Sequence, residues 1–175
     1  MTEDLTVRDS EPGDLTAIEA LYPDAFPDED LLPLVRELLR EPDVVLSLVG
    51  IIGGSLVGHI AFTMCGIDDG DDGAVLLGPL AVAPARQRRG IGGALVRGGL
   101  GQLERSGATH VCVLGDPAYY GRFGFQPDGR VMPPYPLPDE WRGAWQVISL
   151  GDAAPPGLGT LTVPSPWRRP ALWAA

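Results

Sequence analysis

Residues 77–95 constrain the fold more than any other part of the sequence. An apolar strand pattern ends there in an arginine-rich turn, and glycines then open an amphipathic helix pattern. The N-terminus of a helix has unpaired N–H groups and a partial positive charge, so it can bind phosphate. Glycine lets the backbone approach a bulky pyrophosphate closely. The pattern predicts a strand–turn–helix unit that binds phosphate through Arg86, Arg88, Arg89, Gly90, Gly92 and Gly93.

Two better-known phosphate-binding loops are excluded. The Walker pattern needs Gly-Lys-Ser/Thr, and the chain contains no lysine. The dinucleotide pattern G-x-G-x-x-G fails because Leu95 stands at its last glycine position. A nucleotide-binding protein of another kind therefore stays a minor alternative.

The rest of the chain predicts an α/β domain. Apolar runs and helical spacing give the order β-α-α-β-β-β-α-β-α-β, which favours a mixed central sheet. We expect Tyr22-Pro23 to end the first helix. The predicted strands cover residues 5–8, 44–52, 56–64, 74–82, 110–114, a segment from Phe125, and 145–150 as the last clear strand; the predicted helices cover 15–21, 28–39, 90–106 and 118–123.

The length of 175 residues fits one domain with an appendage. We expect the main domain to span residues 1–150. Residues 151–175 are a Pro- and Trp-containing extension, expected to pack on the domain or on a partner subunit, so a homodimer is possible. The segment Pro133–Pro138 is interpreted as a rigid loop that packs on its own domain, with a polyproline ligand as the alternative.

Charge and cysteine usage narrow the functional class. A net charge of −10 argues against non-specific nucleic-acid binding. Cys65 and Cys112 lie far apart without metal-ligand spacing, and no apolar run is long enough to span a membrane. The acidic turn Asp68–Gly73 fails the EF-hand pattern, because Gly70 and Pro79 stand at ligand positions. We expect a cytoplasmic protein with no metal, no membrane partner and no nucleic-acid partner.

Two motifs resemble those of a known superfamily. Gln87–Gly92 is similar to Q/R-x-x-G-x-G/A, the acyl-CoA signature of the GNAT N-acetyltransferases. Tyr120–Phe125 resembles the Tyr-x-x-x-Gly-Phe of the same superfamily, and Leu114–Tyr120 resembles its YhbS-like branch. The resemblance is tight over Leu76–Phe125 and loose over the whole chain.

The resemblance implies a GNAT-like mixed central β-sheet flanked by helices, with a V-shaped opening between the fourth and fifth strands. Acetyl-CoA would bind there as a cosubstrate. Backbone groups of the fourth strand would pair with the pantetheine arm, and the loop N–H groups would hold the pyrophosphate. The implied cofactor-binding residues are Leu80, Ala81, Val82, Gln87, Arg88, Arg89, Gly90, Ile91, Gly92, Gly93 and Tyr120.

The resemblance also assigns a catalytic role to Tyr120. It matches the tyrosine that protonates the departing CoA thiolate in many members. The alternative for Tyr120 is a structural role in which its ring packs with the nearby phenylalanines. Tyr119, the adjacent residue, is the second candidate for the proton donor. Asp116 before Pro117 is interpreted as a helix N-cap with proline at the first helical position.

The general base is less clearly marked. Many relatives carry a glutamate on the fourth strand, but Ala74–Val82 contains no carboxylate. Glu29 is the base candidate, together with Asp28 and Asp30, because the loop before the second helix borders the acceptor site in this fold. A solvated helix start is the alternative for all three. His59 is a further candidate, with a structural histidine as its alternative.

These observations favour an N-acetyltransferase. It would transfer an acetyl or other short acyl group from acetyl-CoA to a primary amine by direct attack in a ternary complex. A non-catalytic CoA-binding or regulatory module on the same fold is the alternative. The acceptor stays open among small metabolites, antibiotics, peptides and proteins.

Overall fold

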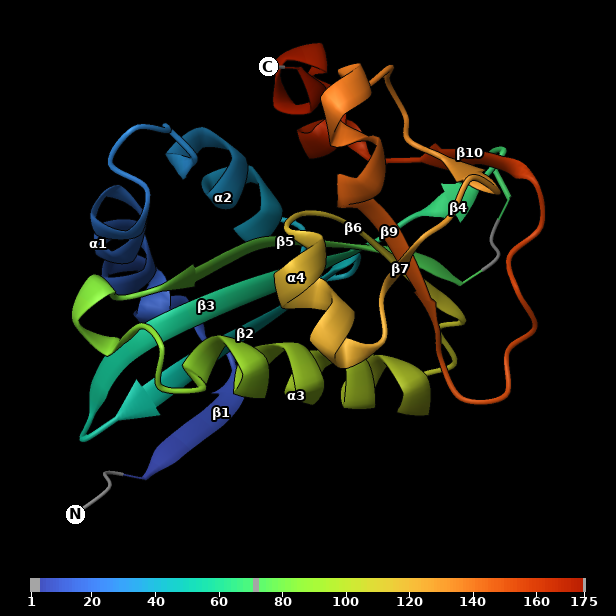
Figure 1. The fold of residues 1–175 in the computed structure, drawn as a ribbon. Helices are drawn as coiled ribbons and strands as arrows, with labels where there is room; N and C mark the ends of the chain where they lie inside the picture. Colours follow the sequence, from blue (N-terminus) through green and yellow to red (C-terminus); the bar gives the residue numbers. More distant parts are fainter. Residues whose placement is uncertain (1–3, 71–72, 175) are drawn as a thin grey trace. The chain divides into compact units, whose positions relative to one another are not determined.

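The computed structural model of the protein describes residues 4–70 and 73–174 (Figure 1). Its contacts divide the chain into two compact units. The first contains residues 1–62 and 78–101, and the second contains residues 63–77 and 102–175. Two strands and one helix of the fold continue from one unit into the other.

The first unit combines strands and helices, and some of these elements belong to it only in part. Its elements are β1 (Leu5–Asp9), α1 (Leu15–Ala25), α2 (Leu32–Leu39), β2 (Val45–Ile52), most of β3 (Ser55–Met64), the second half of β5 (Ala74–Val82) and most of α3 (Ile91–Arg105).

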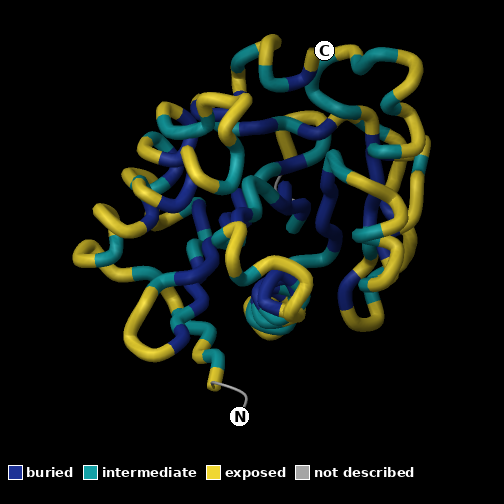
Figure 2. The backbone as a smooth tube through the Cα atoms, turned by 60° about the vertical axis from the view of Figure 1, so that its left-hand side comes forward, coloured by how far each residue is buried: buried dark blue, intermediate teal, exposed yellow. Residues whose placement is uncertain are grey.

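Both faces of this unit's strands are covered by helices. On one face, α1 and α2 form a buried cluster with Val49 of β2 and Ala81 of β5. On the other face, a β-carbon at Gly58 would lie 2.9 Å from Leu95 Cδ1 of α3. A glycine at this position therefore lets α3 pack directly on the backbone of β3. Figure 2 shows that the turns are mainly exposed, whereas the strands between them are mainly buried.

The second unit holds the remaining strands and a short helix. Its elements are the first half of β5, β4 (Gly66–Ile67), β6 (His110–Leu114), α4 (Pro117–Tyr120), β7 (Gln126–Pro127), β8 (Val131–Met132), β9 (Trp145–Ser149) and β10 (Gly159–Thr162).

Strand pairing confirms the predicted fold class. The large sheet has the order β1-β2-β3-β5-β6-β9-β7, and a small sheet has the order β4-β10-β8. β5 pairs with β6 in parallel, whereas β1 with β2 and β6 with β9 pair antiparallel. A large mixed sheet flanked by helices is the α/β architecture that the sequence predicted.

Tryptophan side chains organise the C-terminal part of the second unit. Trp145 Nε1 donates to the Val131 carbonyl at 2.7 Å, and Trp167 Nε1 donates to Thr63 Oγ1 at 3.0 Å. The ring of Trp173 lies edge-on to Trp145 at 5.7 Å. Residues 159–162 pair with both β4 and β8. The domain boundary at residue 150 and a homodimer stay predictions.

Two predicted helix boundaries were wrong. Helix α1 continues through Pro23 to Ala25. A proline near the end of a helix removes a single backbone hydrogen bond, which packing of the buried Tyr22 and Ile18 can offset. Helix α2 begins at Leu32 and not at Asp28, with Pro33 in its first turn. The fixed φ of proline suits that position.

The predicted end of the β-structure was also wrong. Trp145–Leu150 is not the last strand, because β10 follows at Gly159–Thr162. Within the acidic turn, the Asp68 carboxylate accepts from Thr160 N at 2.9 Å, so this side chain fixes β10. The prediction for Asp71 and Asp72 lies outside the described residues.

Candidate active site

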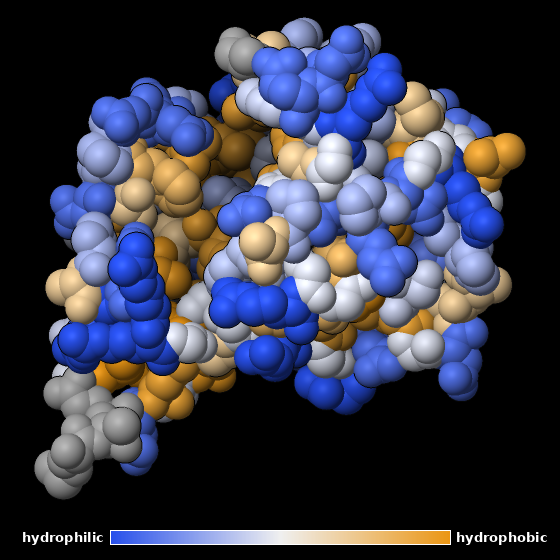
Figure 3. All heavy atoms as spheres, in the orientation of Figure 1, coloured by the Kyte–Doolittle hydropathy of each residue, from blue (hydrophilic) through white to orange (hydrophobic). Residues whose placement is uncertain are grey.

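The turn between β5 and α3 reverses the chain directly before the N-terminus of a helix. A short 3-10 turn at Pro84–Arg86 follows β5, and the Gln87 side chain donates to the Val82 carbonyl at 3.1 Å. Arg88 and Gly90 then adopt φ values of +64° and +80° before α3 begins. Hydrophilic side chains gather over this turn in Figure 3. The exposed Arg88 and Arg89 lie directly before the N-terminus of α3 in the chain.

Glycine at position 90 serves the backbone conformation. A β-carbon there would meet nothing within 4 Å, so space is not the constraint. Its positive φ is the constraint, because residues with a side chain rarely adopt it. Arg88 has a positive φ as well and is exposed. Two left-handed residues so close together reverse the chain just before the helix N-terminus.

The strand before this turn changes character in its middle. β5 is fully buried over Ala74–Leu77, which pair with His110–Val113 of β6. Gly78, Pro79 and Leu80 are half-buried, and the Gly78–Pro79 peptide is cis. At its end, Ala83 N donates to the Val57 carbonyl at 2.8 Å, which holds the strand to β3. The V-shaped opening stays a prediction.

Tyr120 ends helix α4 of the second unit. Asp116 caps this helix, because its Oδ1 accepts from Ala118 N at 2.9 Å, and Pro117 follows as predicted. The Tyr120 ring lies 5.0 Å from Tyr119 and 5.7 Å from Phe125 between ring centres. Burial raises the pKa of the Tyr120 hydroxyl, and Tyr119 adds to the effect. The hydroxyl therefore keeps its proton at neutral pH.

Tyr119 is held by a different partner. The Arg122 guanidinium lies over its ring at 4.5 Å, and Arg122 Nε donates to the Tyr119 carbonyl at 3.2 Å. A cation over the ring face stabilises this arrangement. Tyr119 thus has a structural partner in the same short segment, whereas Tyr120 is packed among aromatic rings.

The loop between α1 and α2 encloses a hollow of about 310 Å³. Glu29, Asp28 and Asp30 are exposed on its rim. The Tyr22 and Phe26 rings stack with their centres 6.1 Å apart. The hollow therefore combines an aromatic wall with carboxylates. The residues that line it are Tyr22, Pro23, Phe26, Pro27, Asp28, Glu29, Asp30, Leu31 and Leu32.

His59 of β3 is buried and contacts Tyr22 of α1. Its Nδ1 lies 2.6 Å from the Tyr22 hydroxyl, and its Nε2 lies 2.8 Å from Ser47 Oγ. Burial lowers the pKa of His59 to about 4, so the imidazole is neutral near pH 7. Burial likewise raises the pKa of Tyr22. The partners of His59 were not identified from the sequence, since no local motif connects them.

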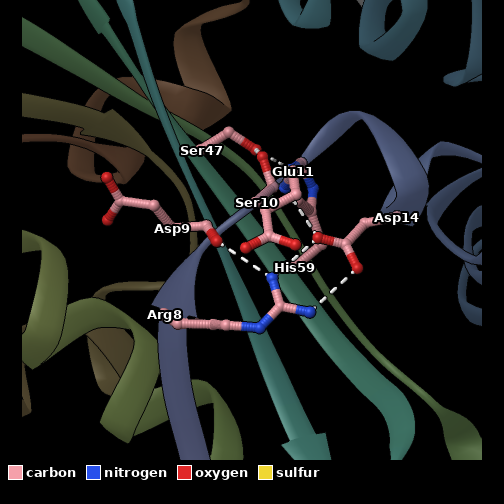
Figure 4. Close-up of polar contacts among 7 residues, drawn as sticks. All are labelled: Arg8, Asp9, Ser10, Glu11, Asp14, Ser47 and His59. Carbon is pink, nitrogen blue, oxygen red and sulfur yellow. Dashed lines mark hydrogen bonds and ion pairs between the residues drawn. The ribbon is translucent and has the colours of Figure 1, made fainter.

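An ion pair beside this group fixes the turn from β1 to α1 (Figure 4). Arg8 donates through both terminal nitrogens to Asp14, at 2.8 and 3.0 Å. Glu11 N donates to the same carboxylate at 2.7 Å. The hydrogen bond from Arg8 holds the pKa of Asp14 below its usual value. Ser10, between these residues, donates to Ser47 Oγ at 2.7 Å.

The predicted residues fall into two groups. The turn residues Gln87–Gly93, the strand residues Leu80–Val82 and the candidate base Glu29 belong to the first unit, and Tyr120 belongs to the second. Over residues 4–70 and 73–174, no cluster of three His, Cys, Asp or Glu side chains is arranged to hold a metal ion. Of the described helices, none is long and apolar enough to span a bilayer. The cellular compartment stays a prediction.

Comparison with known proteins identifies the family. The profile of the acetyltransferase (GNAT) family matches residues 15–125. Two Escherichia coli K12 proteins described as uncharacterized N-acetyltransferases are similar. YjhQ is 36% identical over 83% of this chain and 84% of its own length, and YhbS is 32% identical over 88% and 92%. The chain belongs to the GNAT family of acetyltransferases.

Solved structures agree with this assignment. Escherichia coli YhbS in complex with CoA is 30% identical, with a TM-score of 0.86 over 97% of this chain and 94% of that chain. A GNAT family acetyltransferase from Brucella melitensis in complex with acetyl-CoA is 31% identical, with a TM-score of 0.76 over 95% and 99%. The similarity to the YhbS branch, predicted from Leu114–Tyr120, is confirmed.

Proposed function

We propose that the protein transfers an acetyl or other short acyl group from acetyl-CoA to a primary amine. The β5–α3 turn carries this proposal. Its left-handed Arg88 and Gly90 reverse the chain just before the N-terminus of α3, and the Gln87 side chain donates to the Val82 carbonyl. Similar proteins bind CoA and acetyl-CoA. The N–H groups from Arg88 to Gly93 would hold the pyrophosphate, with Arg89 and Ile91 among them.

The half-buried part of β5 is proposed to hold the pantetheine arm. The pairing with β6 covers Ala74–Leu77, and the strand then continues to Val82. The backbone of Leu80, Ala81 and Val82 would pair with the pantetheine amides as an added strand does. An opening between β5 and β6 beyond Leu77 would give the thioester access to the acceptor.

The reaction would proceed by direct attack in a ternary complex. The neutral amine nitrogen forms a bond to the thioester carbon while the carbon–sulfur bond breaks. The amine loses one proton, and the thiolate receives one. Tyr120, whose hydroxyl burial keeps protonated, is the proposed proton donor to sulfur. Glu29, on the rim of the aromatic hollow, is the proposed base candidate.

The hollow in the α1–α2 loop is proposed to receive the acceptor. Its carboxylates attract an ammonium group, and the half-buried Phe26 ring favours a cation near its face. A primary amine without a strong negative charge fits this chemistry.

The experiment is a panel of primary amines with detection of free CoA thiol. We expect amine-dependent release of CoA and an acetylated amine of the corresponding mass. Acetyl-CoA incubated without protein gives the background rate, and the Tyr120→Phe protein gives the matched control. Binding of acetyl-CoA with no release of thiol for any amine would instead support a non-catalytic CoA-binding module.

A further inference from the structure

Four hydrogen-bonding side chains form a continuous row through the first unit. Ser10 Oγ donates to Ser47 Oγ at 2.7 Å, Ser47 Oγ lies 2.8 Å from His59 Nε2, and His59 Nδ1 lies 2.6 Å from the Tyr22 hydroxyl. His59 and Tyr22 are each 1% exposed, whereas Ser10 and Ser47 are half-buried. Figure 4 shows the end of this row at Ser10, Ser47 and His59. The row therefore leads from the buried interior towards the surface.

The two partners of His59 have an unusual property in common. Both are hydroxyl groups, and a hydroxyl can donate or accept a hydrogen bond. Each tautomer of the imidazole is therefore satisfied without movement of a heavy atom. In one arrangement Ser10 donates to Ser47, Ser47 to Nε2, and Nδ1–H to Tyr22. In the other arrangement every one of these bonds is reversed.

The other histidine of the chain shows the contrast. His110 Nε2 lies 2.7 Å from the Ala154 carbonyl, which can only accept a hydrogen bond. This carbonyl fixes the proton on Nε2 and leaves one tautomer. A fixed acceptor of this kind sets which ring nitrogen carries the proton. His59 is also buried but has no such fixed partner among its two ring contacts.

The ends of the row reach different surroundings. Tyr22 lines the hollow beside Glu29 and belongs to the buried cluster that contains Ala81 of β5. Ser10 and Ser47 line a second hollow of about 460 Å³, with Asp9 and Glu11 at its rim. Ser10 is fixed there because its N–H donates to the Ser47 carbonyl at 2.8 Å.

We propose that Tyr22, His59, Ser47 and Ser10 form a proton path from the α1–α2 hollow to the surface, and that the acceptor amine loses its proton through it. The inference rests on the proposed function. It assigns an exit for the proton in a chain whose β5 has no carboxylate.

The transfer conserves protons at every group. The amine N–H bond breaks, and its proton joins the Tyr22 oxygen while the Tyr22 proton passes to Nδ1. The Nε2 proton passes to Ser47, the Ser47 proton to Ser10, and the Ser10 proton to water. Each hydroxyl keeps one proton, and His59 ends in its other neutral tautomer. Because burial keeps the imidazole neutral, it transmits the proton without storing it.

The surroundings of His59 contain few charges that could act in its place. Tyr22 of α1 and Ser47 of β2 are its polar contacts. Charged side chains on the elements packed around it are exposed or half-buried: Arg8 and Asp9 on β1, Glu19 and Asp24 on α1, and Arg36 and Glu37 on α2.

Nitrogen NMR tests the proton path without a measurement of enzyme activity. In ¹⁵N-labelled protein at pH 7, both ring nitrogens of His59 should show shifts intermediate between protonated and unprotonated values. His110 should show a protonated Nε2, because this nitrogen faces the Ala154 carbonyl. The His59→Gln and His110→Gln proteins assign the signals. A single tautomer at His59 would overturn the path.

The pH profile of CoA release tests the transport. At pH 7, kcat of His59→Gln and Tyr22→Phe should fall about 10²-fold, the lower end of general acid–base catalysis. The loss should shrink towards pH 10, where amines lose their proton in water. KM for acetyl-CoA should not change, and His110→Gln should match the wild-type profile. Ser47→Ala, at the half-buried end, supplies a variant with little loss of core volume.

Two failures are distinguishable. A wild-type protein that releases no CoA with any amine contradicts the proposed function, while the nitrogen spectra still report on the path. An active wild-type protein whose folded His59→Gln and Ser47→Ala variants keep the wild-type pH profile contradicts the path alone. If Glu29→Gln then shifts the profile, the exposed carboxylate is the route of the proton.

Discussion

Gly115 and Tyr120 are packed so closely that the tyrosine ring occupies the place of a side chain at Gly115. A β-carbon at Gly115 would lie 2.8 Å from Tyr120 Cδ2 and closer still to Cε2. The backbone there is not free to move, because Gly115 N donates to the Ala144 carbonyl at 2.9 Å and its carbonyl accepts from Gln146 Nε2 at 3.1 Å. The direction of the phenol therefore depends on the absence of a side chain five residues earlier.

Gly115→Ala should displace the Tyr120 ring. We expect turnover to fall about as far as in Tyr120→Phe, and the free energy of unfolding to fall by about 1–3 kcal/mol from overpacking. Steady-state CoA release and urea unfolding measure the two effects. Gly121→Ala is the matched control, since a β-carbon there meets nothing within 4 Å and its φ is −57°. Equal turnover in both variants would contradict the prediction.

Tyr120→Phe should keep the aromatic packing and remove the proton donor. Turnover should fall by roughly 10²-fold, the lower end of general acid catalysis. The loss should appear in kcat and kcat/KM together, because the interaction is made in the transition state. Affinity for acetyl-CoA should stay near the wild-type value in a binding titration. If chemistry limits turnover and Tyr120→Phe retains the wild-type rate, Tyr119 becomes the next residue to test.

Gly92→Glu should remove the response to the cofactor. Acetyl-CoA should raise the Tm of the wild-type protein, because a ligand that binds only the folded state stabilises it. A carboxylate at position 92 would face the pyrophosphate and abolish this rise. Gly13→Glu adds the same charge at an exposed glycine with nothing within 4 Å, and it should keep the wild-type response. A folded Gly92→Glu protein with an unchanged Tm shift would remove the phosphate-site assignment.

The buried His59 should make stability depend on pH. Its pKa is about 4 in the folded state and near 6.5 in the unfolded state, so the unfolded chain binds more protons in between. Stability is fully present above pH 6.5 and decreases as the pH falls towards 4. One such group gives a loss of about 2 kcal/mol between pH 7 and pH 5. Urea unfolding at both pH values measures it.

The His110→Gln protein is the control for this measurement of stability against pH. His59→Gln should be less stable than the wild type at pH 7 and should lose most of this pH dependence. His110→Gln should retain the decrease between pH 7 and pH 5. If His59→Gln loses as much stability between pH 7 and pH 5 as the wild type does, another group causes the pH dependence. The Asp14 carboxylate is not that group, because its pKa is lowered from an already acidic value.

Some of this structure follows directly from the sequence. The strands at Ala74–Val82 and His110–Leu114 have the predicted bounds, because continuous apolar runs with β-branched residues favour strands buried on both faces. The cap at Asp116 was predictable for a similar reason: the Asp-Pro pair satisfies a helix start through local bonds. Local patterns were sufficient where the stabilising contacts are themselves local.

The remainder depends on contacts between distant residues. The Tyr22 hydroxyl and His59 are 37 positions apart, and Trp167 reaches Thr63 across 104 positions. Strand β10 has only four residues and pairs with segments far away in the chain. Neither periodicity nor a motif marks such partners. The same holds for the continuation of α1 past Pro23, which depends on burial of the helix and not on its propensity.

The position of the tryptophans has a consequence for spectroscopy. Trp141, Trp145, Trp167 and Trp173 are the four tryptophans of the chain, and all of them fall within residues 102–175. Indole emission therefore reports on the second unit only, whereas far-ultraviolet circular dichroism, which senses α1, α2 and α3, also reports on the first. Coincident denaturation curves from the two signals would mean that the units unfold as one cooperative body. Separate curves would identify, from the order of the two signals, which unit loses its structure first.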